Sequence, residues 1–117
     1  MESRTALDAL GALAQDTRLA LFRHLVTLGP AGAPAGVLAE RFALPAATLS
    51  FHLKALADAE LAVGTRHGRQ IRYAANYTTM TALVGYLNEN CCAADASACS
   101  PVPLPSPARR RRDRSRP

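Results

Sequence analysis

The sequence lacks any long hydrophobic run and any segment of the secretory type. No stretch of about 18 apolar residues occurs among its 117 residues, which excludes a conventional transmembrane helix. The first five residues include an acid and are not followed by the apolar stretch that a signal peptide needs. We therefore expect a cytoplasmic protein without a membrane partner. This length is enough to bury one modest core, so we expect one folded domain.

Cysteine is scarce, and its three copies, Cys91, Cys92 and Cys99, lie within nine residues of one another. An odd count in a reducing compartment argues against a disulfide framework and for metal binding or redox chemistry. An adjacent pair and one further thiol cannot complete the tetrahedron of structural zinc without a borrowed ligand. Three thiolates suit a trigonal, thiophilic ion such as As(III) or Sb(III). The alternative is that these are adventitious or redox-labile thiols.

The sequence also lacks the constellations of an enzyme. Its three histidines, His24, His52 and His67, fall on three different predicted elements, so no nucleophile, base and orienting group line up. No glycine-rich phosphate loop and no carboxylate pair occurs. We therefore expect a protein that is not an enzyme and that uses no organic cofactor.

Excess basic charge is absent from most of the chain. The net charge is +5, but residues 1–99 hold eight basic and eight acidic residues and are neutral overall. Residues 100–117 carry the whole excess, in an arginine run that follows a proline-rich stretch. The proline spacing there predicts disorder. The run either solubilises the domain or adds nonspecific affinity for an anion.

Apolar spacing predicts helices in the first part of the chain. Leu7, Leu10 and Leu13 are three residues apart and predict a helix over residues 5–14. Asp16 or Thr17 is expected to cap the next helix, which Gly29-Pro30 ends. Residues 29–34 then read as a loop.

Two further helices are predicted close together, over residues 35–42 and from Pro45 to about residue 59. Leucines spaced four and then three apart define the buried stripe of the second helix. Its other face carries small and hydroxylic residues and a lysine, which suits a helix that reaches base edges and phosphates in the major groove. The candidate DNA contacts on this helix are Thr48, Ser50, Phe51 and Lys54, with His52 at the flank. A helix-turn-helix unit has this layout, and an ordinary helix pair in a bundle is the alternative.

A β-hairpin is predicted after the helix pair. Residues 61–65 and 70–74 alternate apolar and polar side chains on either side of a turn that contains glycine. Arg66, Arg69 and Arg72 fall within seven residues without an acid between them, so the basic charge of the neutral domain is local. A solvated loop is the bland interpretation. Directly after a recognition helix, the hairpin indicates a wing that contacts the phosphate backbone.

The last predicted helix begins after a cap at Asn76 and ends near Asn90. In so small a domain, the apolar surfaces of the first and last helices are most simply covered by a second copy. We therefore predict a mainly α fold with a small β-hairpin, a winged helix-turn-helix that forms a homodimer through its first and last helices. Residues 1–92 form the DNA-binding and dimerisation domain, and residues 93–117 form the metalloid-binding segment and the Pro/Arg-rich tail. The partner is operator double-stranded DNA with two half-sites.

Several local strings resemble the ArsR/SmtB family of winged-helix metalloregulatory repressors. They are Asp-Thr-Arg-Leu from residue 16, Val-Leu-Ala-Glu-Arg-Phe from residue 37, Leu-Ser-Phe-His-Leu-Lys-Ala-Leu from residue 49, and Gly-Arg-Gln-Ile-Arg-Tyr from residue 68. The resemblance covers about residues 5–92. It implies a cytoplasmic homodimer that binds its operator and leaves when a toxic metal or metalloid binds.

The metal-binding residues of the family are only partly matched. In the best-known arsenic sensor, the cysteines precede the recognition helix, and the matching positions here are Pro34, Gly36 and Ala39, which cannot ligate. The zinc and cobalt sensors use carboxylates and histidines of the last helix, where this chain has Glu89 and no histidine.

Other arsenic repressors of the family carry an adjacent cysteine pair and a third cysteine beyond the last helix, and Cys91, Cys92 and Cys99 resemble that set. The resemblance thus implies an inducer site for As(III), with Sb(III) as a further candidate. A regulator of Cd, Pb or Zn remains an alternative. So does a redox regulator in which Cys91 or Cys92 forms a reversible disulfide with Cys99.

Overall fold

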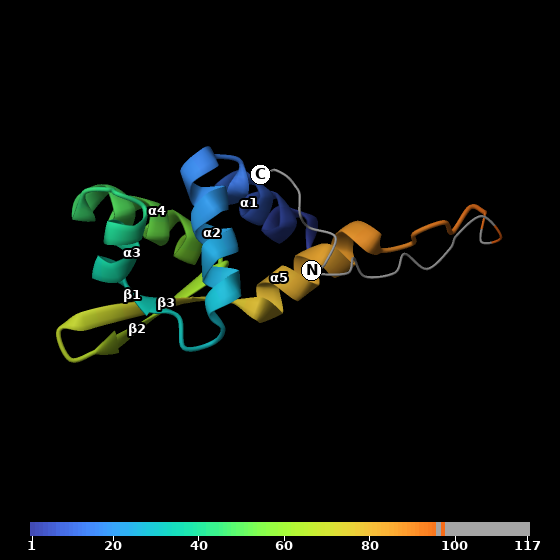
Figure 1. Cartoon of the computed structure of the whole chain (residues 1–117). Helices are drawn as coiled ribbons and strands as arrows, with labels where there is room; N and C mark the ends of the chain where they lie inside the picture. Colours follow the sequence, from blue (N-terminus) through green and yellow to red (C-terminus); the bar gives the residue numbers. More distant parts are fainter. Residues whose placement is uncertain (96, 98–117) are drawn as a thin grey trace, which may run out of the picture.

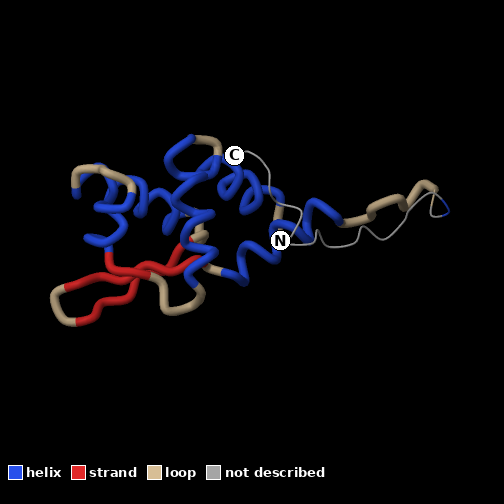
Figure 2. Tube along the Cα trace, in the orientation of Figure 1, coloured by secondary structure: helices blue, strands red, loops and turns tan. Residues whose placement is uncertain are grey.

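The computed structural model describes residues 1–95 and 97. Within them, helices surround one end of a small antiparallel sheet (Figures 1 and 2). No helix in this part of the chain has both the length and the apolar character needed to cross a lipid bilayer. The elements in chain order are α1 (Ser3–Leu13), α2 (Asp16–Leu28), β1 (Ala33–Pro34), α3 (Ala35–Arg41), α4 (Ala46–Asp58), β2 (Ala62–His67), β3 (Gln70–Ala75) and α5 (Tyr77–Asn88).

The first two helices form an angled pair at the N-terminus. The core-facing side of α1 is built from the small residues Ala6 and Ala9, which let the helix approach its neighbours closely, while Leu7 and Leu10 are exposed. The α2 cap differs from the expectation at Asp16 or Thr17. Gln15 occupies the cap position, and its side-chain oxygen accepts a hydrogen bond of 2.8 Å from the backbone N–H of Arg18.

The helix pair α3 and α4 has the predicted bounds to within one residue at each end. The predicted buried stripe of α4 is confirmed, since Leu49, Leu53 and Leu56 are almost completely buried. These leucines pack in one core with Leu21 and Leu25 of α2, among other buried residues. Burial of a leucine side chain contributes about 2 kcal/mol, so this stripe fixes the rotation of α4 about its own axis.

The sheet contains a strand that the sequence pattern did not reveal. The hairpin β2–β3 was predicted, but part of the expected loop over residues 29–34 forms β1, which pairs with β3 at the register Ala33 to Tyr73 and Pro34 to Arg72. Two residues are too few to show an alternating pattern. Gly32, with a φ of +61°, turns the chain into this strand.

The last helix begins as predicted. The Asn76 side chain accepts a hydrogen bond of 3.3 Å from the backbone N–H of Thr79 and caps α5. The helix ends at Asn88, two residues before the expected end, and extends away from the rest of the fold in Figure 1. Leu83 is buried against the core, while Val84 and Leu87 are 54% and 61% exposed. The outer face of α5 is therefore an apolar surface that the rest of the described chain does not cover.

His24 of α2 gives the fold a pH-dependent contact with α3. Its Nδ1 accepts a hydrogen bond of 3.1 Å from Arg41 Nε, and its ring packs edge-on against Phe42. Burial, and secondly the charge of Arg41, lower the pKa of His24 below its ordinary value of 6.5.

This lowered pKa predicts a loss of stability in acid. Near and below pH 6.5 the unfolded chain binds more protons at this histidine than the folded chain, so the free energy of unfolding falls as the pH falls from 6.5 to the lower folded-state pKa. We expect His24→Asn to lose less stability than wild type between pH 7.5 and pH 5.5 in urea denaturation. Equal losses of stability in both proteins would contradict a lowered pKa of His24 in the folded chain.

Candidate nucleic-acid interface

The exposed face of α4 presents four of the five side chains predicted to contact DNA. Thr48, Ser50, Phe51 and Lys54 are all exposed, and the Phe51 side chain is 65% exposed. They occupy the side opposite the buried leucine stripe, so the same packing that anchors α4 sets which residues face outward. A large apolar ring at such a position is suited to contact with the methyl group of thymine.

His52, the fifth residue of α4 predicted to contact DNA, lies elsewhere than expected. Its side chain is only 9% exposed, and it lies on the inner side of α4, where Nδ1 is 3.4 Å from Arg18 Nη1. It precedes the buried Leu53 and follows the exposed Phe51, so the flank of the helix at this position turns toward the core. His52 therefore does not belong to the surface that α4 offers to DNA.

Lys54 is held by an ion pair on the helix surface. Its Nζ lies 3.2 Å from Asp58 Oδ2, one turn further along α4, and both side chains are largely exposed. Exposed pairs of this spacing stabilise a helix by about 0.3–0.5 kcal/mol. So weak a pair can be exchanged for a phosphate contact at little cost.

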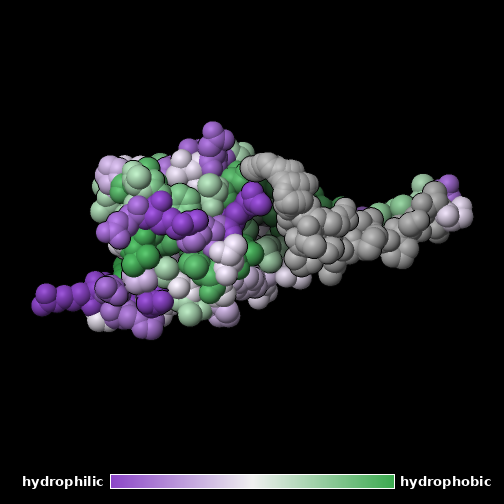
Figure 3. Space-filling view, viewed as in Figure 1, coloured by the Kyte–Doolittle hydropathy of each residue, from purple (hydrophilic) through white to green (hydrophobic). Residues whose placement is uncertain are grey.

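The wing carries its basic residues at and near its tip. Gly68, with a φ of +63°, is the first residue of the two-residue turn between β2 and β3, the position that type II′ turns give to glycine. Arg69 is the second, and Arg66 precedes the turn by two residues; both are exposed. Figure 3 shows the tip as a strongly hydrophilic projection from the body of the molecule.

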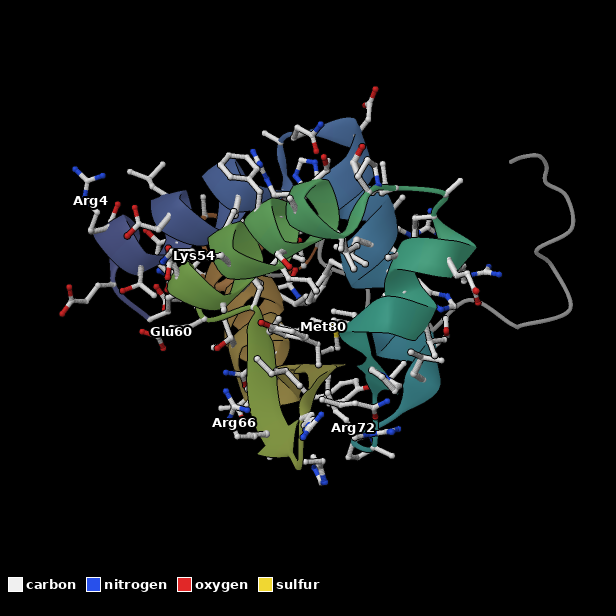
Figure 4. The ribbon with its side chains drawn as sticks, turned by 90° about the vertical axis from the view of Figure 1, so that its left-hand side faces the viewer. Arg4, Lys54, Glu60, Arg66, Arg72 and Met80 are labelled. Carbon is white, nitrogen blue, oxygen red and sulfur yellow. The ribbon has the colours of Figure 1, made fainter. Side chains whose placement is uncertain are left out.

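The two faces of the wing separate Arg66 from Arg72. Paired residues share a face, and Arg66 pairs with Ile71 whereas Arg72 pairs with Thr65. Ile71 lines the cleft between the wing and α4, so Arg66 faces the side of the recognition helix. Figure 4 shows Arg66 and Arg72 on opposite sides of the hairpin, with Lys54 on α4 above.

Arg72, on the other face of the wing, also contacts the backbone of the fold. Its Nε and Nη2 each donate a hydrogen bond of 3.2 Å, to the carbonyl oxygens of Ala31 and Gly32 respectively. The guanidinium thus holds the turn before β1 against the sheet. It is half-buried on the face of the wing opposite Arg66 and so has a role in the fold, while its phosphate contact stays a prediction.

A cleft of about 330 Å³ lies between the helix-turn-helix and the wing, next to Ser50 of α4. Arg69 and Gln70 line its wing side, and Gly36 lines its α3 side. Gln70 was not among the predicted contacts. The signal that points to it is a polar residue directly after the turn, next to Arg69. The cleft thus brings Ser50 of α4 and Arg69 and Gln70 of the wing to one site, over a floor that includes Pro34 and Ile71.

The two described cysteines lie beyond α5 and not within it. Cys91 and Cys92 are in the turns that follow Asn88, and Cys92 has a φ of +60°. Their Sγ atoms are 3.8 Å apart, well beyond the length of about 2.05 Å of a disulfide. Leaving the helix lets adjacent side chains approach one another, which a regular helix prevents. The third predicted ligand, Cys99, lies outside the described residues, and the described residues alone contain no group of three metal-ligating side chains.

Comparison with known proteins supports the fold and its use in transcription. Residues 13–65 match the sequence family of the helix-turn-helix domain. No curated protein matches the chain.

Solved structures resemble most of the described fold. An ArsR-like transcriptional regulator from Rhodococcus sp. RHA1 has 25% identity and a TM-score of 0.68, over 79% of this chain and 84% of that one. HlyU from Vibrio cholerae N16961 has 26% identity and a TM-score of 0.61, over 79% and 99% of the two chains. The antimony-specific transcriptional repressor AntR has 27% identity and a TM-score of 0.52, over 76% and 77%. The predicted winged helix-turn-helix is thus confirmed, and the solved structures that share it include transcriptional regulators.

Proposed function

We infer that the chain belongs to the ArsR/SmtB family of transcriptional regulators, and we propose that it is a metalloid-responsive repressor. In this proposal it binds operator DNA as a dimer and is released when As(III) or Sb(III) binds its cysteines. The observation that carries the DNA-binding half is the exposed polar face of α4 beside the basic wing tip, on a fold shared with transcriptional regulators.

The two parts of the interface have different tasks. Thr48 and Ser50, near the start of α4, are short hydrogen-bonding side chains and suit contact with base edges in the major groove. Lys54 on α4, with Arg66 and Arg69 on the wing, suits contact with phosphates, which gives affinity without sequence information. Gly68 at the wing tip lets the backbone come close to the sugar-phosphate chain.

The dimer is proposed from the apolar surface of the first and last helices. Leu7 and Leu10 of α1 and Val84 and Leu87 of α5 are all at least 40% exposed. Solvent contact of four large apolar side chains on two neighbouring helices is unfavourable by roughly 25 cal/mol per Å². A two-fold dimer covers them with the same residues of a second copy and places two α4 helices on adjacent half-sites.

The inducer site is proposed at Cys91, Cys92 and Cys99. The close approach of the two described sulfur atoms, at 3.8 Å, supports joint ligation of one soft ion by the adjacent pair. A structural neighbour that is an antimony-specific repressor supports a trivalent metalloid as the ion. Each sulfur loses its proton on binding, so affinity for the ion increases with pH.

The proposed switch follows from the position of this site. The cysteines directly follow α5, the helix proposed for the dimer interface. Closing three sulfurs around one ion changes the end of α5, and release requires that the ion bind the DNA-incompetent dimer more tightly than the competent one. A difference of about 1–3 kcal/mol changes operator affinity by about 5–150-fold.

Substitutions on the interface test the DNA-binding half on a duplex that the wild-type protein selects from a randomised pool. We expect Lys54→Ala and Arg69→Ala to weaken binding to all sequences and to lower the salt slope of log K by about one each. Thr48→Ala and Ser50→Ala are expected to change discrimination at one base position by about 1–3 kcal/mol. Fluorescence anisotropy at several salt concentrations measures both effects, and the stoichiometry should be two chains per duplex.

Arg23→Ala is the matched control, since Arg23 is an exposed arginine on α2 and belongs neither to α4 nor to the wing. It should leave the affinity and the salt slope near their wild-type values. Unchanged operator affinity in all four interface variants would remove α4 and the wing as the DNA-binding surface.

A further inference from the structure

One arginine side chain connects three helices at the inner side of α4. Arg18, in the first turn of α2, donates a hydrogen bond of 2.8 Å from Nε to the carbonyl oxygen of Ala12 near the end of α1. The Nη1 of the same guanidinium is 3.4 Å from Nδ1 of His52 on α4. Its backbone N–H is also engaged, in the Gln15 cap that begins α2. The corner between α1 and α2 is thus joined to the recognition helix through a single side chain.

Both ends of this link are groups that need a partner. The Ala12 carbonyl is among the last four of α1, which receive no hydrogen bond from an N–H group of the same helix. A cation at this end of the helix also complements the helix dipole. The His52 ring is buried beside an apolar stripe of α4. Since arginine only donates, a hydrogen bond between these two groups requires Nδ1 of His52 to be the acceptor.

His52 is also placed to pass a displacement on to the DNA-facing surface. It is adjacent in sequence to Phe51, which is 65% exposed on the outer side of α4, and the two ring centroids are 5.5 Å apart. A shift of the His52 ring therefore moves the helix segment that carries Ser50, Phe51 and Lys54. The leucine stripe fixes the rotation of α4 about its own axis, and the contact of His52 with Arg18 is the polar tie between this helix and the α1–α2 corner.

We propose that Arg18 is a positioning residue for DNA recognition, which holds α4 at its working angle to the α1–α2 corner through His52. This inference rests on the proposed function, because it assigns α4 to DNA and α1 to the dimer interface. Arg18 then lies between the helix that faces the second copy and the helix that faces the operator. It acts through His52 and has no contact with DNA of its own.

A planar fork is needed for this task. Nε and Nη1 are two separate nitrogens of one rigid plane and meet acceptors on different helices, whereas the three donors of a lysine ammonium all sit on one nitrogen and do not reproduce that spacing. Arg18→Lys is therefore expected to behave as a partial loss, between wild type and Arg18→Met.

A double-mutant cycle on operator affinity tests the link, with the duplex selected by the wild-type protein as the probe. We expect Arg18→Met to weaken binding about tenfold or more in the wild-type background and less than about threefold in a His52→Leu background. His52→Asn keeps an acceptor near the position of Nδ1, so Arg18→Met should retain its full cost there. The salt slope should stay at the wild-type value in every variant, because no phosphate contact is lost.

The controls separate this role from the others that an arginine can have. Arg23→Met removes an exposed charge from the same helix and should have little effect, and circular dichroism checks that each variant is folded. If Arg18→Met does not fold, the same cycle is measured with Arg18→Lys, and the expected changes in operator affinity are smaller. An equal cost of the Arg18 change in all three His52 backgrounds, or a salt slope lowered by about one, would overturn the positioning role alone. Failure of the wild-type protein to select or bind any duplex would overturn the proposed function together with it.

Discussion

Gly32→Ala is expected to lower the free energy of unfolding by about 3 kcal/mol or more. Gly32 has a φ of +61°, and a Cβ added there would lie 2.0 Å from the carbonyl oxygen of Tyr73 and 2.7 Å from its carbon. These are backbone atoms of β3, which cannot rotate away as the end of a side chain can. The substitution therefore strains the backbone and also pushes β1 away from the sheet.

Two other glycines allow the cost of backbone strain to be measured without the steric clash of an added Cβ. Gly68 has nearly the same φ, +63°, and Gly29 has a φ of +80°, but an added Cβ would meet no atom within 4 Å at either position. Gly68→Ala should cost about 1 kcal/mol, the cost of a positive φ alone. Gly29 combines its positive φ with a ψ of −177°, which is essentially confined to glycine, so Gly29→Ala should cost about 1–3 kcal/mol from backbone strain without a clash. Urea denaturation followed by circular dichroism measures all three. A cost at Gly32 no larger than at Gly68 would contradict the close packing of this turn against β3.

Cys92→Ser is expected to leave operator affinity unchanged and to raise the arsenite concentration needed for release about 100-fold or more. Changing an outer-shell partner already costs a metal site about 10–100-fold in affinity, so removal of a direct sulfur ligand belongs at or above that upper end. Serine is close to cysteine in size but does not replace a thiolate toward a soft ion. The same result is expected for Cys91→Ser and Cys99→Ser, since the proposed geometry requires all three sulfurs.

The measurement is a titration of the protein on its selected duplex with arsenite, antimonite, zinc, cadmium and peroxide in parallel. Ser97→Ala is a matched control in the same segment, because Ser97 bonds to the Asp95 carboxylate at 2.7 Å and supplies no sulfur. Release by arsenite and antimonite supports the three-sulfur site. Normal arsenite release in all three cysteine variants would eliminate it, and release by peroxide alone would favour the redox regulator.

The pattern of leucines carried most of the fold prediction. Leu49, Leu53 and Leu56 are three or four residues apart, and this spacing is visible in one sequence and determines both faces of α4. Arg66, Arg69 and Gly68 mark the wing because charge and turn chemistry are local properties. Asn76 predicts the start of α5 because helix capping is also a local property. The exposed positions Thr48, Ser50, Phe51 and Lys54 follow from the leucine stripe once it is known.

What the sequence could not reveal depends on partners that are far away in the chain. His52 lies at the edge of the buried stripe of α4, and its partner there, Arg18, is 34 residues earlier in the chain. Arg72 is on the far face of the wing because of the pairing register, and the carbonyls that it binds are some 40 residues away. The strand β1 exists because β3 is there to pair with it. Local propensity contains none of this information.

The passage from β1 to α3 constrains the length of the chain as well as its composition. Pro34 is the last residue of the strand and Ala35 the first of the helix, so no spare residue separates them. One inserted or deleted residue would either break the pairing of Ala33 with Tyr73 or rotate α3 by about 100° relative to α4. Loops on a protein surface commonly tolerate such changes in length. Here the connection fixes the distance between the wing and the helix-turn-helix. Homologues are therefore expected to differ at this connection by substitutions and not by insertions or deletions.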